Sequence, residues 1–403
     1  MKPPEPSLAG GAREWLEENQ VSTHDQGLAK PDSSPAISRA PLKWSYSCTH
    51  QECTLHQLSP YIGKLKSVIA RDLLLRYTKA GDLVVDMFCG SGTVPLEAAR
   101  LGRRVLASDS SRYAIVLTKG KLYAPDNEET ATTKLERIIT DTERLPLPDL
   151  QDIPAWVQSF FHPLTLRETL RLAHVLSARR HYFYLASLLG ILHHQRPGFL
   201  SYPSSHLVPY LRPIKFPREE YPELYDYRAV PPRLQAKIGR ALRRPPETHL
   251  RAQVVGVRLS AAQSLTLPAD IDCVLTSPPY MNALDYQRDN RLRLWLLRKG
   301  GGTASRDRGI STDSAFRSLM VRMVSRIQEK LRLGGHCIFV VGERTARGKC
   351  FYPCDVLAEV VANHGSRLQL IEVINDTIPD VRRSRRDGRA VKRENILVFR
   401  RTR

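Results

Sequence analysis

Long apolar runs are missing from this 403-residue sequence. A membrane-spanning helix needs about 20 consecutive apolar residues, and a secretory signal needs a shorter apolar core near the N-terminus. Neither pattern is present, so we expect no membrane insertion and no secretion. Cysteine is also scarce: there are 7 in the whole chain, an odd number, which favours reduced thiols in the cytoplasm.

Recognisable metal-ligand spacing is lacking as well. The candidate ligands form two loose groups, which are Cys48, His50, Cys53 and His56, and Cys350 with Cys354. A structural zinc site takes four ligands in closely spaced pairs, and these intervals are unusual for one. We therefore expect no metal.

Acidic residues are few compared with basic ones. The chain has 61 Lys and Arg against 41 Asp and Glu, a formal net charge of +20 with a pI near 9.9. At 42% hydrophobic residues, a folded core is still expected. So large a basic excess favours a polyanionic partner such as nucleic acid.

A glycine-rich turn between a strand and a helix is the first motif with chemical content. The strand is Leu83 to Asp86, the turn reads Met-Phe-Cys-Gly-Ser-Gly-Thr, and the helix covers Pro95 to Leu101. A second strand, Arg104 to Ala107, leads to Asp109, which can accept hydrogen bonds from both hydroxyls of a ribose. The turn is not GxGxxG and contains no basic residue, so an adenosine ligand without phosphates fits better than a dinucleotide.

The second motif is Thr-Ser-Pro-Pro-Tyr at residues 276–280, directly after an apolar run from Ile271 to Leu275 that reads as a buried parallel strand. A Pro-Pro step continues neither a helix nor a sheet ladder, so it leaves acceptors at the strand end, where open α/β sheets bind ligands. With Tyr280 beside them, the carbonyls of Ser277 and Pro278 suit a planar amine. The alternative is a proline-rich strand exit without chemistry.

Together the two motifs resemble those of the amino-methylating DNA methyltransferases, which use S-adenosylmethionine. The SPPY form is more typical of the cytosine-N4 branch. The stretch from Ser59 to Lys64 is similar to the segment that touches the methionine end of the cofactor in that family. The resemblance implies catalytic roles for Ser277, Pro278, Pro279 and Tyr280. It implies cofactor contacts for Tyr61, Gly63, Asp86, Phe88, Cys89, Gly90, Ser91, Gly92, Thr93 and Asp109.

We expect an α/β fold of the class I methyltransferase, Rossmann-like type, with a seven-stranded, mostly parallel sheet interrupted by a largely helical insertion. The expected organisation is a disordered tail (1–44), a cofactor-binding half (45–125), a helical and basic insertion for target recognition (126–250) and a catalytic half (251–403). Two helices are predicted in the insertion, at Leu164 to Leu176 and His181 to His194. A third, Ser314 to Leu331, is expected to stop at Gly334.

Two basic clusters are candidate DNA contacts. Arg233, Lys237 and Arg240 follow one side of a predicted helix in the insertion, near several tyrosines, and Arg382, Arg383, Arg385 and Arg386 precede the last strand. Cations interleaved with aromatic rings suit a nucleic-acid groove. The alternative is a solvated helix face and a solvated loop. The expected partner is duplex DNA with the target base flipped out, with a restriction endonuclease for the same site as a further candidate, in a cytoplasmic protein of bacterial or phage type associated with the nucleoid.

Three alternatives remain open from the sequence. Instead of cytosine N4, the target amine could be adenine N6 in DNA or the amine of an RNA base. The third alternative is an inactive relative that binds nucleic acid. One departure bears on the last of these. The family often has an acidic residue at the exit of its third strand, where this sequence reads Leu259-Ser260-Ala261. Ser260 can still hydrogen-bond the adenine edge, so it is included among the cofactor contacts.

Overall fold

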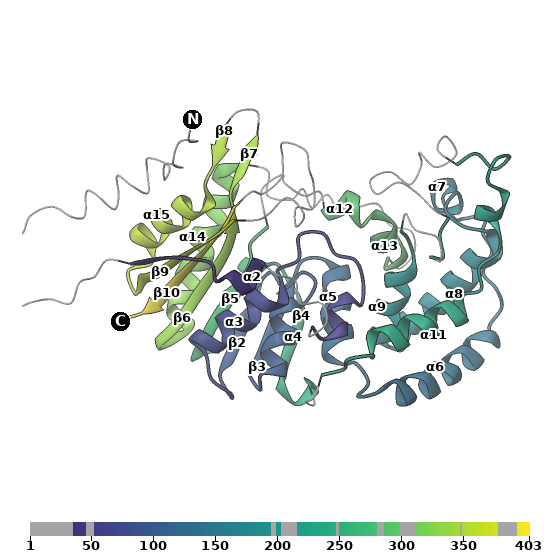
Figure 1. The fold of residues 1–403 in the computed structure, drawn as a ribbon, viewed down its shortest axis with the longest axis horizontal. Coiled ribbons are helices and arrows are strands. Elements are labelled where there is room, and N and C mark those ends of the chain that lie inside the picture. Colours follow the sequence, from purple (N-terminus) through teal and green to yellow (C-terminus); the bar gives the residue numbers. More distant parts are fainter. Residues whose placement is uncertain are drawn as a thin grey trace, which may run out of the picture.

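The computed structural model describes residues 35–45, 52–194, 199–202, 216–246, 250–279, 286–298, 312–346, 349–377 and 393–403. Within them, one large sheet forms the centre of the molecule (Figure 1). Its strands, in chain order, are β1 (Ala36–Arg39), β2 (Leu83–Asp86), β3 (Arg104–Asp109), β4 (Val254–Leu259), β5 (Ile271–Thr276), β6 (Leu331–Gly342), β9 (Leu368–Thr377) and β10 (Arg393–Arg401). A separate hairpin pairs β7 (Arg344–Ala346) with β8 (Lys349–Phe351).

The sheet order is β1-β9-β10-β6-β5-β2-β3-β4. Neighbouring strands from β6 to β4 run parallel, whereas β10 is antiparallel to both β6 and β9. All seven strands expected from the sequence are present, and β1 adds an eighth at the edge beside β9, so the expected strand number is corrected while the expected class I fold is confirmed. After β1, the chain enters the centre of the sheet at β2, runs outward through β3 and β4, and then returns to β5 before it runs outward on the other side through β6. Thus β2 and β5 flank the point where the strand order reverses.

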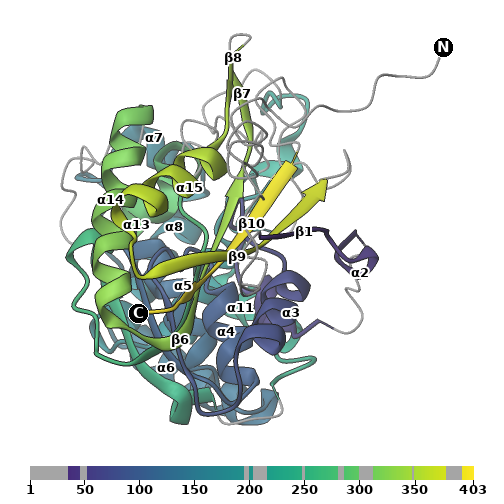
Figure 2. The ribbon, with the colours of Figure 1, turned by 90° about the vertical axis from the view of Figure 1, so that its left-hand side faces the viewer.

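Helices cover both faces of this sheet (Figure 2). Successive strand residues point to opposite faces, so Val84 and Leu275 join one core while Val85 and Val274 join the other. The first face carries α3 (Ser67–Tyr77), α4 (Thr93–Arg100) and α5 (Arg112–Leu122). The second carries α14 (Asp313–Lys330) and α15 (Pro353–His364).

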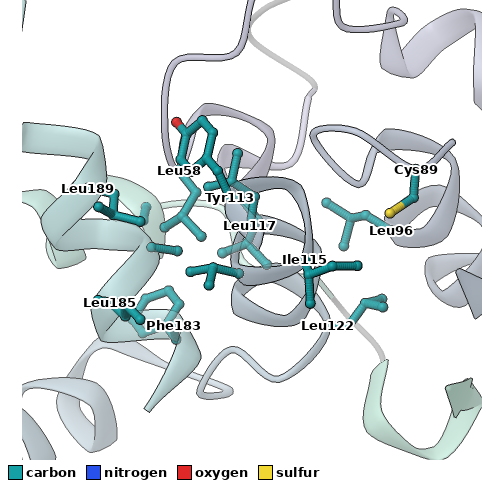
Figure 3. Packing of buried hydrophobic residues seen from close by; sticks show 14 of the residues in the cluster. Leu58, Cys89, Leu96, Tyr113, Ile115, Leu117, Leu122, Phe183, Leu185 and Leu189 are labelled. Atoms are coloured by element: carbon teal, nitrogen blue, oxygen red, sulfur yellow. The ribbon is translucent and has the colours of Figure 1, made fainter. Parts of the chain in front are cut away.

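The insertion is helical where it is described. Its helices are α6 (Glu128–Glu143), α7 (Ala155–Gln158), α8 (Pro163–Ala178), α9 (Tyr182–Ile191), the short η3 (Pro222–Tyr225) and α11 (Val230–Ala241). They gather on the right of Figure 1, away from β9 and β10. Figure 3 shows how they attach: Ile115, Leu117 and Leu122 of α5 lie between side chains of α9 and α4. The insertion therefore shares one apolar core with the cofactor-side helices.

The remaining short elements are α2 (Leu42–Ser45), η1 (Thr54–Gln57), η4 (Leu250–Gln253), η5 (Ala262–Ser264), α12 (Tyr286–Asp289) and α13 (Arg291–Leu296). Within the described residues, no helix is long and apolar enough to cross a membrane.

Three sequence predictions need correction. The tail expected to reach residue 44 is wrong at its end, because β1 pairs in parallel with β9 and α2 buries Trp44 completely. The spacing of Ile62, Leu65, Ile69 and Leu73 predicts one apolar helix face, but the helix begins only at Ser67. Gly334 does not stop α14; it lies within β6 at φ +75°, and α14 ends at Lys330.

Candidate functional site

Three polar residues end neighbouring parallel strands. Asp86 is the last residue of β2, Asp109 of β3 and Thr276 of β5. Because these strands are adjacent in the order β5-β2-β3, their carboxyl ends open on the same edge of the sheet. This edge, at the reversal of strand order, is where α/β sheets bind ligands. In Figure 1, α12 and α13 lie above it, between the sheet and the insertion.

The glycine turn after β2 has a backbone that only glycine adopts easily. Gly90 has φ +46° and Gly92 has φ +76°, both in the left-handed region. A Cβ on Gly92 would lie 2.7 Å from Oγ1 of Thr118, and one on Gly90 would lie 3.3 Å from the Tyr61 ring. The α4 helix then begins at Thr93, so its free N–H groups lie at the turn. Tyr61 and Thr118 thus pack so closely on the turn that only glycine fits at positions 90 and 92, and we call residues 90–92 the glycine cradle.

Asp109 is joined to this turn. Its Oδ2 accepts a hydrogen bond of 2.9 Å from the Gly90 N–H, and its Oδ1 accepts one of 2.8 Å from the Ser111 N–H. The carboxylate that the sequence predicts for a ribose therefore lies where the glycine cradle is.

A hydrogen bond connects the two sequence motifs. Oγ1 of Thr276 donates to Oδ1 of Asp86 over 2.7 Å, and the N–H of Phe88 lies 3.1 Å from that same Thr276 oxygen. Thr276 is fully buried and Asp86 nearly so. Burial raises the pKa of Asp86 to about 7, although the hydrogen bonds from Thr276 and Phe88 counter this. Ser277, the next residue, is therefore held beside the glycine turn by contacts of its neighbour.

Three tyrosine rings stand beside the cradle. The ring of Tyr61 lies 5.9 Å from that of Tyr113 in a stacked arrangement and 6.0 Å from that of Tyr286. The Tyr113 hydroxyl donates to the Pro60 carbonyl over 2.6 Å and lies 2.6 Å from Oγ of Ser59. Tyr61 was predicted from the family resemblance. Sequence reasoning missed Tyr113 and Tyr286, because a tyrosine in a helix has no local signal that separates packing from binding.

Most of the other predicted cofactor residues belong to the glycine turn itself. Cys89, Ser91 and Thr93 are buried, and Oγ1 of Thr118 donates to Sγ of Cys89 over 3.4 Å, so they support the turn from within. Burial raises the pKa of the Cys89 thiol well above its usual value. Gly63, in the segment before α3, has φ +74°.

Ser260 lies next to Asp109 but is engaged locally. Its N–H donates to the Asp109 carbonyl over 3.0 Å, and its hydroxyl donates to the Ala261 carbonyl over 3.2 Å. The residue thus ties the exits of β3 and β4 together. A contact with the adenine edge remains a prediction.

Of the catalytic motif, Ser277, Pro278 and Pro279 are described. Pro278 is buried, and the other two are half-buried at the end of β5. Tyr280 lies outside the described residues, as do Arg382, Arg383, Arg385 and Arg386.

The basic residues of α11 do not share one solvent-facing side. Nζ of Lys237 donates to the Gln57 carbonyl over 2.7 Å, and burial lowers its pKa to about 8. Nη1 of Arg233 donates to the Ala229 carbonyl over 3.1 Å. Arg240 is exposed and lines a groove with Arg243 and Glu128. Of the three predicted contacts, Arg240 is thus the one best placed for a partner.

The first cysteine and histidine group does not form a metal site where it is described. His56 is buried, and its Nε2 lies 2.7 Å from Oε1 of Glu97, which also accepts a hydrogen bond from Arg100. Across the described residues, no group of three or more His, Cys, Asp and Glu side chains has the arrangement of a metal site.

Comparison with known proteins finds a match to one family over part of the chain. Residues 41–119 match a family model described as DNA methylase. Type II methyltransferase M.MjaII from Methanocaldococcus jannaschii is 29% identical over 87 residues, which is 22% of this chain and 16% of that protein's length. The match thus spans only a small part of that relative.

Solved structures resemble the chain only distantly. TrmN from Thermus thermophilus has a TM-score of 0.33 at 12% identity, covering 86% of this chain and 52% of that one. An rRNA methylase from Streptococcus thermophilus also has a TM-score of 0.33, at 9% identity, covering 84% of this chain and 98% of that one. Because these TM-scores are low, the fold is assigned from the observed order of the strands in the sheet and not from the solved structures.

Proposed function

We propose that this chain methylates the exocyclic amine of a base in DNA, with cytosine N4 as the favoured target. The match of residues 41–119 to a DNA methylase family model supports this proposal. The observation that carries the proposal is the hydrogen bond from Thr276 to Asp86. It holds the strand end that leads into Ser277 and Pro278 beside the glycine cradle. A methyl donor and a target amine must meet in such a place.

The cofactor is S-adenosylmethionine, which supplies an electrophilic methyl group on a sulfonium. We place the nucleoside of the cofactor beside the glycine cradle, at the N-terminus of α4. Asp109, whose carboxylate lies at the glycine turn, is the proposed acceptor for the ribose hydroxyls, and Tyr61 forms the adjoining wall.

Ser277 and Pro278 would act on the target amine. The lone pair of an exocyclic amine is delocalised into the ring, so the nitrogen must become pyramidal before it attacks. If the Ser277 hydroxyl and the Pro278 carbonyl each accept one N–H, the lone pair is directed at the methyl group. The same acceptors stabilise positive charge as it develops on nitrogen. The methylated ammonium is acidic and releases its proton to solvent or to Ser277, so no strong base is required.

Duplex DNA as substrate requires that the base leave the stack, at a cost of a few kcal/mol. We propose that stacking on Tyr280 returns roughly 1–3 kcal/mol of this and that phosphate contacts supply the remainder. The charge of +20 supports a polyanionic substrate. Arg240 and the arginines at 382, 383, 385 and 386 are the proposed phosphate contacts. A restriction endonuclease acting on the same site remains part of the proposal.

Asp109→Asn is expected to weaken cofactor binding. The substitution removes the charged acceptor, which is worth roughly 1.5–3 kcal/mol per hydrogen bond. Calorimetry with S-adenosylmethionine, without nucleic acid, measures the effect. Asp152→Asn, which changes an exposed carboxylate, is the matched control. An affinity equal to the parent's would remove Asp109 from the site.

Ser277→Ala is expected to slow methyl transfer by about 10²–10³-fold, because it removes an acceptor that matters most as nitrogen becomes cationic. Affinity for the cofactor should be unchanged. Single-turnover transfer to duplex DNA, with calorimetry alongside, separates the two quantities. Ser264→Ala, at an exposed serine of η5, serves as control. If the variant transfers methyl at the parent rate, Ser277 has no catalytic role and the Pro-Pro step is only the end of a strand.

The experiment that tests the function is expression in a host that lacks such enzymes, followed by mass analysis of nucleosides. N4-methylcytosine in the host DNA is the expected product. N6-methyladenine in DNA would show that the target base is adenine. A methylated amine found only in RNA would show that the substrate is RNA and not DNA. If no new nucleoside forms although the protein binds DNA, the chain is a binding protein and the proposal is wrong.

A further inference from the structure

Tyr286 lies on the cofactor side of the site although it follows the catalytic motif in sequence. It is half-buried at the start of α12, and its ring contacts that of Tyr61, which in turn covers Gly90. Burial raises the pKa of the Tyr286 hydroxyl, and the charges of Asp109 and Asp289 raise it further. The phenol therefore stays protonated, and it is near enough to feel the carboxylate proposed to hold the ribose.

The backbone around Tyr286 is anchored. The N–H of Asn290 donates to the Tyr286 carbonyl over 3.2 Å, and Nδ2 of the same asparagine donates to it over 3.0 Å. Asn290 is itself buried and precedes α13 directly. The position of the Tyr286 ring is therefore set by α12 and α13 together.

Arg293 of α13 connects this unit to the insertion. Its guanidinium is buried, donates to the carbonyls of Leu189 and His193 over 3.0 Å each, and lies 5.8 Å from the centre of the Tyr113 ring. The three rings beside the cradle thus come from three parts of the chain: the segment before α3, helix α5, and α12. Through Arg293, α13, which follows α12, is joined to α9.

We propose that Tyr286 is a cofactor-contacting residue that completes the wall begun by Tyr61, so that binding S-adenosylmethionine further stabilises α12 and α13, which follow the catalytic motif in the sequence. This inference rests on the proposed function. A ring that lies against Tyr61 and beside Asp109 adds apolar contact area to a bound nucleoside, and its protonated hydroxyl is a hydrogen-bond donor.

The test is calorimetry of S-adenosylmethionine without nucleic acid. Tyr286→Ala is expected to weaken binding roughly tenfold, through loss of the ring. Tyr286→Phe keeps the ring and should remain within about threefold of the parent, since one neutral hydrogen bond contributes little. Tyr123→Ala, at a half-buried tyrosine at the end of α5, is the matched control and should bind as the parent does.

A second measurement needs no variant. Amide hydrogen exchange of residues 286–298 in the parent should slow by about tenfold when the cofactor is added, because local opening is suppressed. If the parent binds the cofactor but Tyr286→Ala binds equally well, or if exchange in this segment does not change, the inference is wrong and the proposed function stands. If the parent does not bind S-adenosylmethionine at all, the proposed function itself fails.

Discussion

Replacing Lys121 by methionine is expected to stabilise the protein by roughly 3–5 kcal/mol near pH 6, where each pKa unit is worth about 1.4 kcal/mol. Lys121 lies on α5 with 1% of its surface exposed, and among the described residues its Nζ has no hydrogen-bond partner. Burial lowers its pKa to about 7, and the charge of Lys64 lowers it further, while Cys53, Glu52 and Cys89 act in the opposite direction.

The pH dependence follows from these two states. The unfolded chain holds the lysine proton up to its ordinary pKa of 10.5, whereas the folded chain loses it above about 7. Between these values the unfolded state binds more protons, so the lysine's penalty on stability decreases as pH rises. Methionine has a similar volume and no charge. Its advantage should therefore be greatest below about pH 7, fall to about half or less near pH 9 and be lost above pH 10.5.

Urea unfolding of the parent and of Lys121→Met, near pH 6 and near pH 9, measures the difference in the free energy of unfolding. Lys134→Met changes an exposed lysine of α6 and should stay within about 0.5 kcal/mol of the parent at either pH. A Lys121→Met protein less stable than the parent at low pH would show that this ammonium has a compensating partner.

Trp44→Ala is expected to destabilise the protein by about 3–5 kcal/mol, the usual cost of removing a large buried aromatic side chain. Trp44 is fully buried in the core beneath α3, and its Nε1 donates to Oδ2 of Asp72 over 3.1 Å. Its carbonyl accepts a hydrogen bond from Nζ of Lys66, one residue before α3. Truncation leaves both a cavity and an unpaired carboxylate oxygen.

Leu42→Ala is the control within the same four-residue helix. Leu42 is 77% exposed, so its truncation should cost less than about 0.5 kcal/mol. Hydrogen exchange of residues 36–45 gives a second readout, because β1 is held to β9 and the Ala40 N–H donates to the Asn375 carbonyl. If Trp44→Ala unfolds at the same urea concentration as the parent, the segment from β1 to α2 is not part of the cooperative core.

That segment shows why part of the fold was beyond the sequence. The strand Ala36–Arg39 is short, mostly exposed and without apolar alternation, so it has no local signal of a strand. It forms because β9, more than 300 residues later, offers a free edge. Partners so far apart in the chain leave no trace in a local pattern, and Pro, Ser and charge around the segment favoured disorder.

The candidate site also has parts that the sequence predicted and contacts that only the fold brings about. The glycine turn, Asp109 and the SPP motif were predicted because each depends on a few consecutive residues whose backbone preferences are intrinsic: left-handed φ for Gly90 and Gly92, and a broken ladder at Pro278. The hydrogen bond from Thr276 to Asp86 joins residues 190 positions apart, and only the pairing of β2 with β5 brings them together.

The sequence by itself determined every strand of the large sheet except β1, together with the glycine turn and the residue types at the strand ends, since alternation, helical periodicity and backbone preference act over short distances. Tertiary structure decided which polar side chains those elements bring together or bury. It placed Tyr286 against Tyr61, buried Lys121 without a partner and turned Lys237 toward Gln57. The physical reason is that burial and pairing of a side chain depend on what packs over it, and here that neighbour comes from a distant part of the chain.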